Sequence, residues 1–206
     1  KGIIELRRRI VFPVIVDIAD VSEPLTGTLI SMPESHTNVI NDIIIRRGNY
    51  FTKDKENEVI VSEKFAVARN ILPGDFIHLI LNGQKKKLYV IGTAISPEYV
   101  FATPPGSIAP SNSTYGIFWI KQKFAEDRLG FDGAYNNLIG RLSPEAGEFP
   151  DAVIKKIDQK LTPYGIFSSY SLKNQASNQE LSSELSSLST YTVLLPFLFL
   201  GVAALT

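Results

Sequence analysis

The sequence predicts an α+β fold in which a β-rich middle, residues 46–113, lies between segments that mix strands with helices. β-branched residues fill the start of the chain, and apolar residues at helical spacing appear near its end. The 206 residues suffice for one large domain or two small ones. Hydrophobic residues make up 44% and charged residues 20%, which excludes a disordered or low-complexity chain.

Charge and cysteine content exclude several classes of function. The chain carries 21 lysines and arginines and 21 aspartates and glutamates, so it lacks the excess of cations that nucleic-acid binding needs. Because cysteine is absent, a disulfide framework, a zinc–thiolate site and a thiol nucleophile are excluded. The compartment stays open on this evidence.

Strands are predicted first. Residues 3–18 are rich in β-branched residues with Pro13 in the middle, which predicts either one edge strand or two strands broken at the proline. Further strands are predicted at 26–32 and 39–45, and a turn at 47–49.

The β-rich middle contains the clearest local signal. A short strand at 58–62 leads into a helix that Ser62 is expected to cap and that ends near Asn70. The dipeptide Asn82-Gly83 between two β-rich runs predicts a hairpin, with polar residues 84–87 near its tip. The lysines of that tip suit an anionic lipid or a partner, but such residues more often solvate a sheet edge.

After the irregular stretch 96–114, strands and helices alternate. A strand is predicted at 116–120, a helix at 121–129, a strand at 134–142 and a helix at 151–161 with apolar residues on one side.

The C-terminal residues are apolar. No charged residue follows Glu184, and Val193–Leu205 carries no polar side chain. A membrane span needs about 20 apolar residues. The pattern favours the beginning of a transmembrane helix over a buried C-terminal helix, because Pro196 and Gly201 are better tolerated in membranes.

A polar helix precedes this tail. Leu181, Leu185 and Leu188 follow the four-then-three spacing of a narrow apolar seam, among Ser, Asn, Gln and Glu. A stalk leading to the membrane and an amphipathic helix on the core fit this pattern equally well.

Motifs for catalysis, cofactors and metals are absent from the sequence. It contains no nucleotide-binding loop, metalloprotease motif or hydrolase serine motif. Neither His36 nor His78 has partners at metal-ligand spacing. Glu98 is either a buried acid with a role or a carboxylate that fixes a turn, and we favour the second interpretation. We therefore expect no catalytic residue, cofactor or metal site, and the scarcity of histidine disfavours a soluble hydrolase.

One loop stands out as a contact surface. Phe101, Pro104, Pro105 and Tyr115 combine aromatic rings with rigid prolines, a composition common at binding surfaces. The same residues also serve as caps over a core, which we favour. They are the candidate residues for contact with a partner or substrate.

A block from Glu58 to Tyr99 is similar to the large extracytoplasmic domain of MacB/FtsX-like ABC transporter permeases. Residues 46–51 upstream, and 133–142 and 161–165 downstream, fit the same pattern. The resemblance extends from about Arg46 to the C-terminus. The residues that carry it in the block are Glu58, Ser62, Glu63, Phe65, Ala66, Leu72, Pro73, Gly74, Asp75, Gly83, Gly92, Ser96, Pro97, Glu98 and Tyr99.

The resemblance implies two lobes and a stalk. Residues 1–45 and 114–170 are expected to form a mixed α/β porter-like lobe, and 46–113 an inserted β-rich lobe. Residues 171–206 are expected to form a stalk helix and the start of a transmembrane helix. The domain is expected on the periplasmic or extracellular side of the cell (inner) membrane.

The resemblance also implies a function without catalysis in this chain. The domain would couple ATP hydrolysis by a separate cytoplasmic ABC ATPase subunit to export or release of a substrate outside the membrane. The alternative is a non-transporting regulatory or docking module that recruits a cell-envelope partner such as a peptidoglycan hydrolase. A membrane-fusion or adaptor protein is a further expected partner, and nucleic acid is not.

Overall fold

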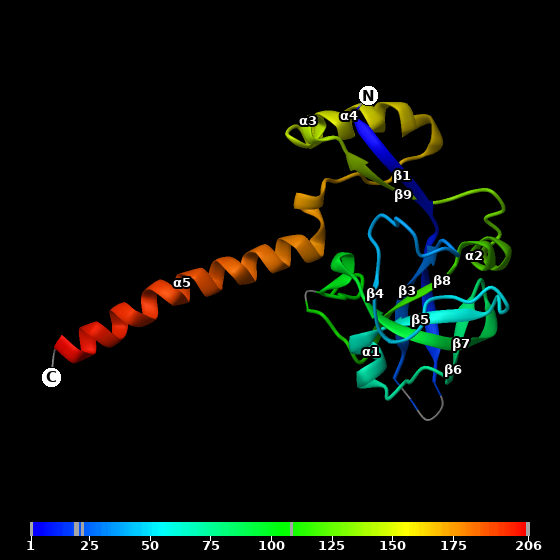
Figure 1. The fold of residues 1–206 in the computed structure, drawn as a ribbon, viewed down its shortest axis with the longest axis horizontal. Helices are drawn as coiled ribbons and strands as arrows, with labels where there is room; N and C mark the ends of the chain where they lie inside the picture. Colours follow the sequence, from blue (N-terminus) through cyan, green and yellow to red (C-terminus); the bar gives the residue numbers. More distant parts are fainter. Residues whose placement is uncertain (1, 19–20, 22, 108, 205–206) are drawn as a thin grey trace. The chain divides into compact units, whose positions relative to one another are not determined.

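The computed structural model describes residues 2–18, 21, 23–107 and 109–204 (Figure 1). The chain divides into two compact units, residues 1–148 and 149–206. Ile108 of the irregular loop, and Leu205 at the end of the predicted apolar tail, lie outside the described residues.

Seven strands of the first unit form one sheet in the order β4-β7-β5-β8-β3-β2-β6. Strand β7 also pairs with β6, so six of the strands form a closed ring of pairings to which β4 is added. Closure removes free edges from those six strands. The strands are β2 (Val11–Asp17), β3 (Leu25–Met32), β4 (Ile44–Gly48), β5 (Glu58–Ser62), β6 (Phe76–Leu81), β7 (Gln84–Ile95) and β8 (Tyr115–Lys121).

A second, two-stranded sheet consists of β1 (Ile3–Arg9) and β9 (Asn137–Leu142), which run antiparallel. We call this sheet the arm and the seven-stranded sheet the ring. The chain enters the ring after β1 and returns to the arm at β9. The helices of the unit are α1 (Glu63–Ala68), α2 (Gln122–Leu129), α3 (Pro144–Gly147) and the short 3-10 helix η1 (Pro97–Tyr99).

This topology corrects the expected lobe boundaries. Strands from 46–113 (β5, β6 and β7) pair directly with strands from the flanking segments (β2 and β8), so residues 46–113 do not form a separate sheet. What lies between the arm strands is the longer segment 10–136. Sequence periodicity could not place these boundaries, because pairing between distant strands decides them.

The first predicted strand region forms two strands, as one of the alternatives had it, but the break falls at Ile10 and not at Pro13. Pro13 lies opposite Thr28 of β3. Pairing of β2 with β6 begins only at Ile15, so the proline sits where β2 has a single neighbour.

Strand β4 lies later than predicted, and 39–43 is not a strand. The expected turn at Gly48 belongs to this strand, where Gly48 pairs with Gly92 of β7. Gly48 has φ +73°, and a Cβ there would lie 2.2 Å from the carbonyl oxygen of Ile91. The close approach of the two strands therefore requires glycine at this position.

The predicted hairpin is confirmed: β6 and β7 are joined at Asn82 and Gly83, both with positive φ. The predicted cap is wrong, since Ser62 makes no capping bond to α1. Its hydroxyl instead accepts a hydrogen bond of 3.1 Å from the backbone N–H of Ile117 in β8.

Both faces of the central strands are buried. Along β8, Phe118 and Ile120 belong to one apolar cluster, which also contains residues of α1 and α2. Ile117 and Trp119 belong to a second cluster, together with Ala102 of the long irregular loop. The loop 96–114 therefore contributes Ala102 to the core, and Tyr115, which follows the loop, is buried in the same cluster as the packing interpretation expected, whereas Phe101 is half-buried.

The second unit contains α4 (Pro150–Leu161), the short 3-10 helices η2 (Thr162–Tyr164) and η3 (Leu172–Asn174), and α5 (Ala176–Ala204). Helix α4 confirms the prediction for 151–161. Helix α5 is continuous from the leucine seam into the apolar tail. Among the helices that the structure describes, none combines the length and apolar character that crossing a membrane requires.

Candidate functional site: the junction of arm and ring

The predicted contact residues do not form one surface. Tyr115 is 6% exposed, and its hydroxyl lies 2.6 Å from that of Thr28 in the neighbouring strand β3. Its place in the contact set is therefore wrong, because the strand turns its ring into the second cluster. Phe101 and Pro104 are half-buried, with the Lys64 ammonium 5.4 Å from the Phe101 ring centre, and Pro105 is exposed.

The three leucines of the predicted seam lie along α5, where they are exposed: Leu181 to 39%, Leu185 to 58% and Leu188 to 60%. The spacing is therefore present on a helix, and its role as a stalk stays a prediction.

His36 has a structural environment. Its ring stacks on Tyr50 at 4.2 Å between centroids, and its Nε2 lies 2.7 Å from the Asp42 carboxylate. The Tyr50 hydroxyl donates to the carbonyl of Pro33, and burial raises the pKa of Tyr50. Within the described part of the chain, no three His, Asp or Glu residues are grouped as a metal ion would need.

The densest set of buried polar contacts lies where the arm meets the ring. Arg9, the last residue of β1, is 4% exposed and pairs with Glu98 through two contacts of 2.6 and 2.5 Å. Its Nε donates to the side-chain oxygen of Asn137, the first residue of β9, at 2.7 Å. One guanidinium therefore joins both arm strands to η1, which follows β7 of the ring.

Glu98 is held in position for this pair. Its backbone N–H donates to the Ser96 hydroxyl at 3.2 Å, and Asn41 donates to its carboxylate at 3.2 Å. The Ser96 hydroxyl thus fixes the turn, while the Glu98 carboxylate accepts hydrogen bonds from Arg9. The interpretation of Glu98 as a turn-fixing carboxylate is corrected accordingly.

The two chain segments that connect the arm to the ring, at Ile10 and Asn136, also form hydrogen bonds. The side-chain amide of Asn136 accepts from the N–H of Val11 at 2.8 Å and donates to its carbonyl at 2.7 Å. This amide pairs with the backbone as a neighbouring strand would. In the other segment, the N–H of Ile10 donates to the Ser31 hydroxyl at 2.8 Å.

Arg7 completes the junction. Its guanidinium donates to the carbonyls of Ile40 at 2.6 Å and Ser31 at 2.9 Å. Burial, followed by the nearby charge of Arg9, lowers the pKa of Arg7. A hollow of about 430 Å³ opens beside it, lined by Glu5, Leu6, Arg7, Arg8, Pro33, Thr37, Asn38, Val39 and Ile40.

This arrangement is suited to fixing orientation. A bidentate arginine–carboxylate pair has strict geometry, and its removal from water makes each lost contact costly. The sequence offered a weak signal for it, since Arg7, Arg8 and Arg9 interrupt the first apolar run. It gave no means of matching Arg9 to Glu98, 89 positions away.

Comparison with known proteins gives distant likenesses among solved structures alone. No family model and no curated protein matches the chain. Among solved structures, the chain is similar to the crystal structure of the extracellular domain of the noncanonic ABC-type transporter YknZ from Gram-positive bacteria. The TM-score is 0.47 at 15% identity, covering 77% of this chain and 76% of that chain. A likeness of this extent assigns neither family nor function.

Proposed function

We propose that this chain is the extracytoplasmic domain of an ABC transporter permease of the MacB/FtsX-like kind, and that it transmits motion between the membrane and the outside. The single observation that supports this most directly is the junction. Both covalent paths into the ring, at Ile10 and at Asn136, pass through it. A displacement of the arm therefore reaches the ring at one place.

The arm has the construction of a lever. Its strands pair from Ile3 opposite Leu142 to Arg9 opposite Asn137, so a pull on either strand is shared through the ladder. At the ring end, Arg9 passes that displacement to Glu98. The Arg9–Glu98 pair resists rotation better than apolar packing, because its hydrogen bonds are directional.

The expected driving partner is a separate cytoplasmic ABC ATPase subunit. Helix α5 is the proposed connection to the cell membrane, since its first half is polar and its residues from Val193 onward are apolar. In this proposal the chain itself has no catalytic, cofactor or metal role. Motion would serve the export or release of a substrate outside the membrane.

A docking module that recruits a cell-envelope partner is the second candidate. The observation in its favour is the loop around Pro105, which is exposed over residues 105–107 while neighbouring residues anchor it in the core. Such a loop offers a rigid contact surface. An adaptor protein or a peptidoglycan hydrolase would be its partner.

The test is affinity purification of the full-length protein from native membranes. We expect an ABC ATPase subunit to co-purify. Recovery from the soluble fraction without an ATPase would overturn the assignment. Recovery of a hydrolase or adaptor without an ATPase would favour the docking module.

Coupling is tested on the same complex by hydrogen exchange with and without a non-hydrolysable ATP analogue. We expect a nucleotide-dependent change in exchange at residues 97–99 in the wild type. The Arg9→Met/Glu98→Met variant should still recover the ATPase but lose this change. An unaltered response in the variant would remove the junction from the mechanism.

A further inference from the structure

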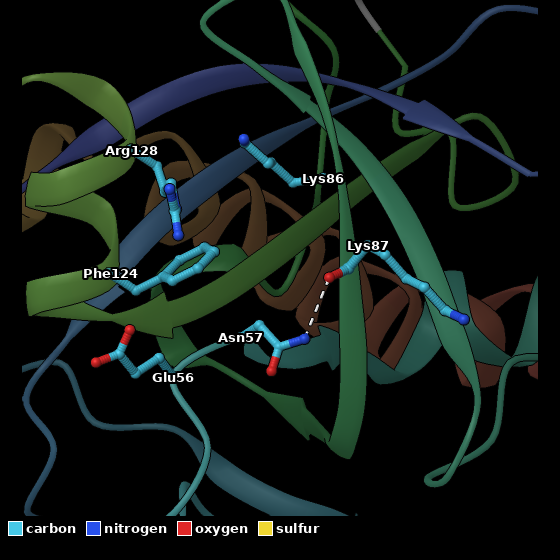
Figure 2. A pocket seen from close by; sticks show the side chains of 6 residues that line it. All are labelled: Glu56, Asn57, Lys86, Lys87, Phe124 and Arg128. Carbon is cyan, nitrogen blue, oxygen red and sulfur yellow. Dashed lines mark hydrogen bonds between the residues drawn. The ribbon is translucent and has the colours of Figure 1, made fainter.

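A hollow of about 360 Å³ lies between helix α2 and the β6–β7 hairpin, away from the residues of the junction (Figure 2). Its lining comprises Glu56, Asn57, Lys86, Lys87, Phe124 and Arg128. Figure 2 shows the side chains of Lys86 and Arg128 on the same side of the Phe124 ring, and Glu56 on the other. Lys87 contributes its carbonyl, which accepts a bond of 3.3 Å from the Asn57 amide, while its side chain points away.

Lys86 lies between the exposed Gln84 and the buried Leu88 on one face of the hairpin. It lies opposite Leu79 in the register, so its side chain emerges on the same face as that fully buried leucine. Leu88, two residues along, is also fully buried on this face. Lys86 itself is half-buried, which places its ammonium at the boundary between core and hollow.

The neighbouring lysines have partners, whereas Lys86 forms no ion pair with the residues that the structure describes. Lys85 pairs with Asp17, and the Lys87 ammonium lies 4.1 Å from the Phe76 ring centre. Among the described residues, no carboxylate lies within ion-pair distance of Lys86. A lysine can cover apolar surface with its aliphatic stem alone, and this structural role does not require a second cation nearby.

Arg128 supplies that second cation. Its guanidinium carbon lies 5.4 Å from the centre of the Phe124 ring, which is 6% exposed and holds the guanidinium from below. The described part of the chain offers Arg128 no carboxylate either. Two cations thus line one hollow, and neither forms an ion pair with a carboxylate of the described residues.

Glu56 adds a negative charge to the lining of the hollow. It too lacks an ion-pair partner among the residues that the structure describes. Glu56 is exposed, so its carboxylate stays hydrated beside a simple anion, whereas a ligand with an ammonium beside its anion would pair with it as well.

We propose that this hollow binds a small zwitterionic group in which a phosphate and a primary ammonium are separated by a few bonds. Lys86 and Arg128 hold the phosphate above Phe124, and Glu56 accepts from the ammonium. Guanidinium and ammonium donors suit a phosphate well, and of the two cations Lys86 is half-buried and Arg128 exposed. Phosphoethanolamine has this chemistry, free or as a lipid headgroup. The inference stands independently of the proposed transporter role.

The test is calorimetric titration of the chain with O-phosphoethanolamine, inorganic phosphate and ethanolamine. We expect O-phosphoethanolamine to bind, phosphate to bind more weakly, and ethanolamine not to bind. Lys86→Gln and Arg128→Gln should each weaken binding about tenfold, the loss of one charge-assisted contact. Glu56→Gln should weaken binding of O-phosphoethanolamine but leave that of phosphate unchanged.

Lys85→Gln is the matched control, because it removes the same charge one residue away on the opposite face of the hairpin. It should change affinity less than twofold. An equal loss in Lys85→Gln would show general electrostatic attraction and overturn the site. Lys86→Arg should restore binding, and thermal unfolding of each variant verifies that the fold is kept.

A second arm distinguishes the source of the group. Flotation with phosphatidylethanolamine vesicles is compared with phosphatidylcholine vesicles, whose quaternary ammonium cannot donate to Glu56. Lys86-dependent binding to the former only would identify the lipid as the source. Failure of both the free compound and the vesicles to bind would overturn the proposal.

Discussion

The ring and the arm of the first unit are stabilised by different interactions. The ring closes on itself and contains two apolar clusters, one on each face of its central strands. The arm has only two strands, and it exposes Ile4 to 62% and Leu6 to 55%. Its attachment depends on polar contacts of Arg9 and Asn136. Replacing one of these polar residues should therefore release the arm while the ring stays folded.

The largest effect is expected in the ring. Phe118 is fully buried, and its ring packs edge-on against Phe65 at 5.5 Å. Phe118→Ala should lower the free energy of unfolding by about 3–5 kcal/mol, because it removes the ring and leaves a cavity. Urea denaturation measures this loss, and Phe118→Leu, which retains much of the volume, should cost clearly less. A loss below about 1 kcal/mol would contradict the view that the ring depends on its core.

The next effect is expected at the junction. Arg9→Met leaves the Glu98 carboxylate, 11% exposed, without its cation. We expect the free energy of opening of the arm to fall by about 3 kcal/mol, because an uncompensated charge remains partly buried. Hydrogen exchange should show faster exchange in β1 and β9 while β8 stays protected.

The matched control is the double variant Arg9→Met/Glu98→Met, which leaves no unpaired charge. It should recover part of the lost protection in the arm. Equal acceleration of exchange in β8 would show that arm and ring unfold together, which would contradict separate stabilisation of the two sheets.

A smaller effect is expected at Asn136. Asn136→Ala removes both hydrogen bonds to Val11 and should cost about 1–2 kcal/mol in the same exchange measurement. Asn136→Asp keeps the acceptor for the Val11 N–H but loses the donor, so it should fall between wild type and alanine at pH 4 to 7. An aspartate variant less protected than alanine would show that the carboxylate clashes with the Val11 carbonyl.

The smallest effect is expected at the exposed pair of Lys85 and Asp17. The hydrogen bond from Lys85 lowers the pKa of Asp17. Because the folded-state pKa lies below the ordinary value of about 3.9, the pair stabilises the fold above that pH and loses its effect as the pH falls. NMR titration should show the Asp17 pKa rising toward the ordinary value in Lys85→Ala, with the fold intact. An unchanged pKa would mean that the pair does not persist in solution.

Elements defined by neighbouring residues could be predicted from the sequence. The Asn82-Gly83 hairpin follows from turn residues that accept positive φ, and α2 and α4 follow from helical periodicity. The packing interpretation of the proline-rich loop was also available, since aromatic residues beside small ones cap a core. Each of these depends on interactions within about a dozen residues.

The strand order, the extent of the ring and the junction were decided only by the tertiary structure. Residues 46–113 are β-rich whether or not they form a separate lobe, and only their pairing with β2 and β8 shows that they do not. The same holds for Tyr115, whose burial depends on the second apolar cluster, which residues from distant parts of the chain form. The sequence does not indicate that Arg9 and Glu98 form a pair, because pairing across 89 positions depends on where the sheets bring the chain together.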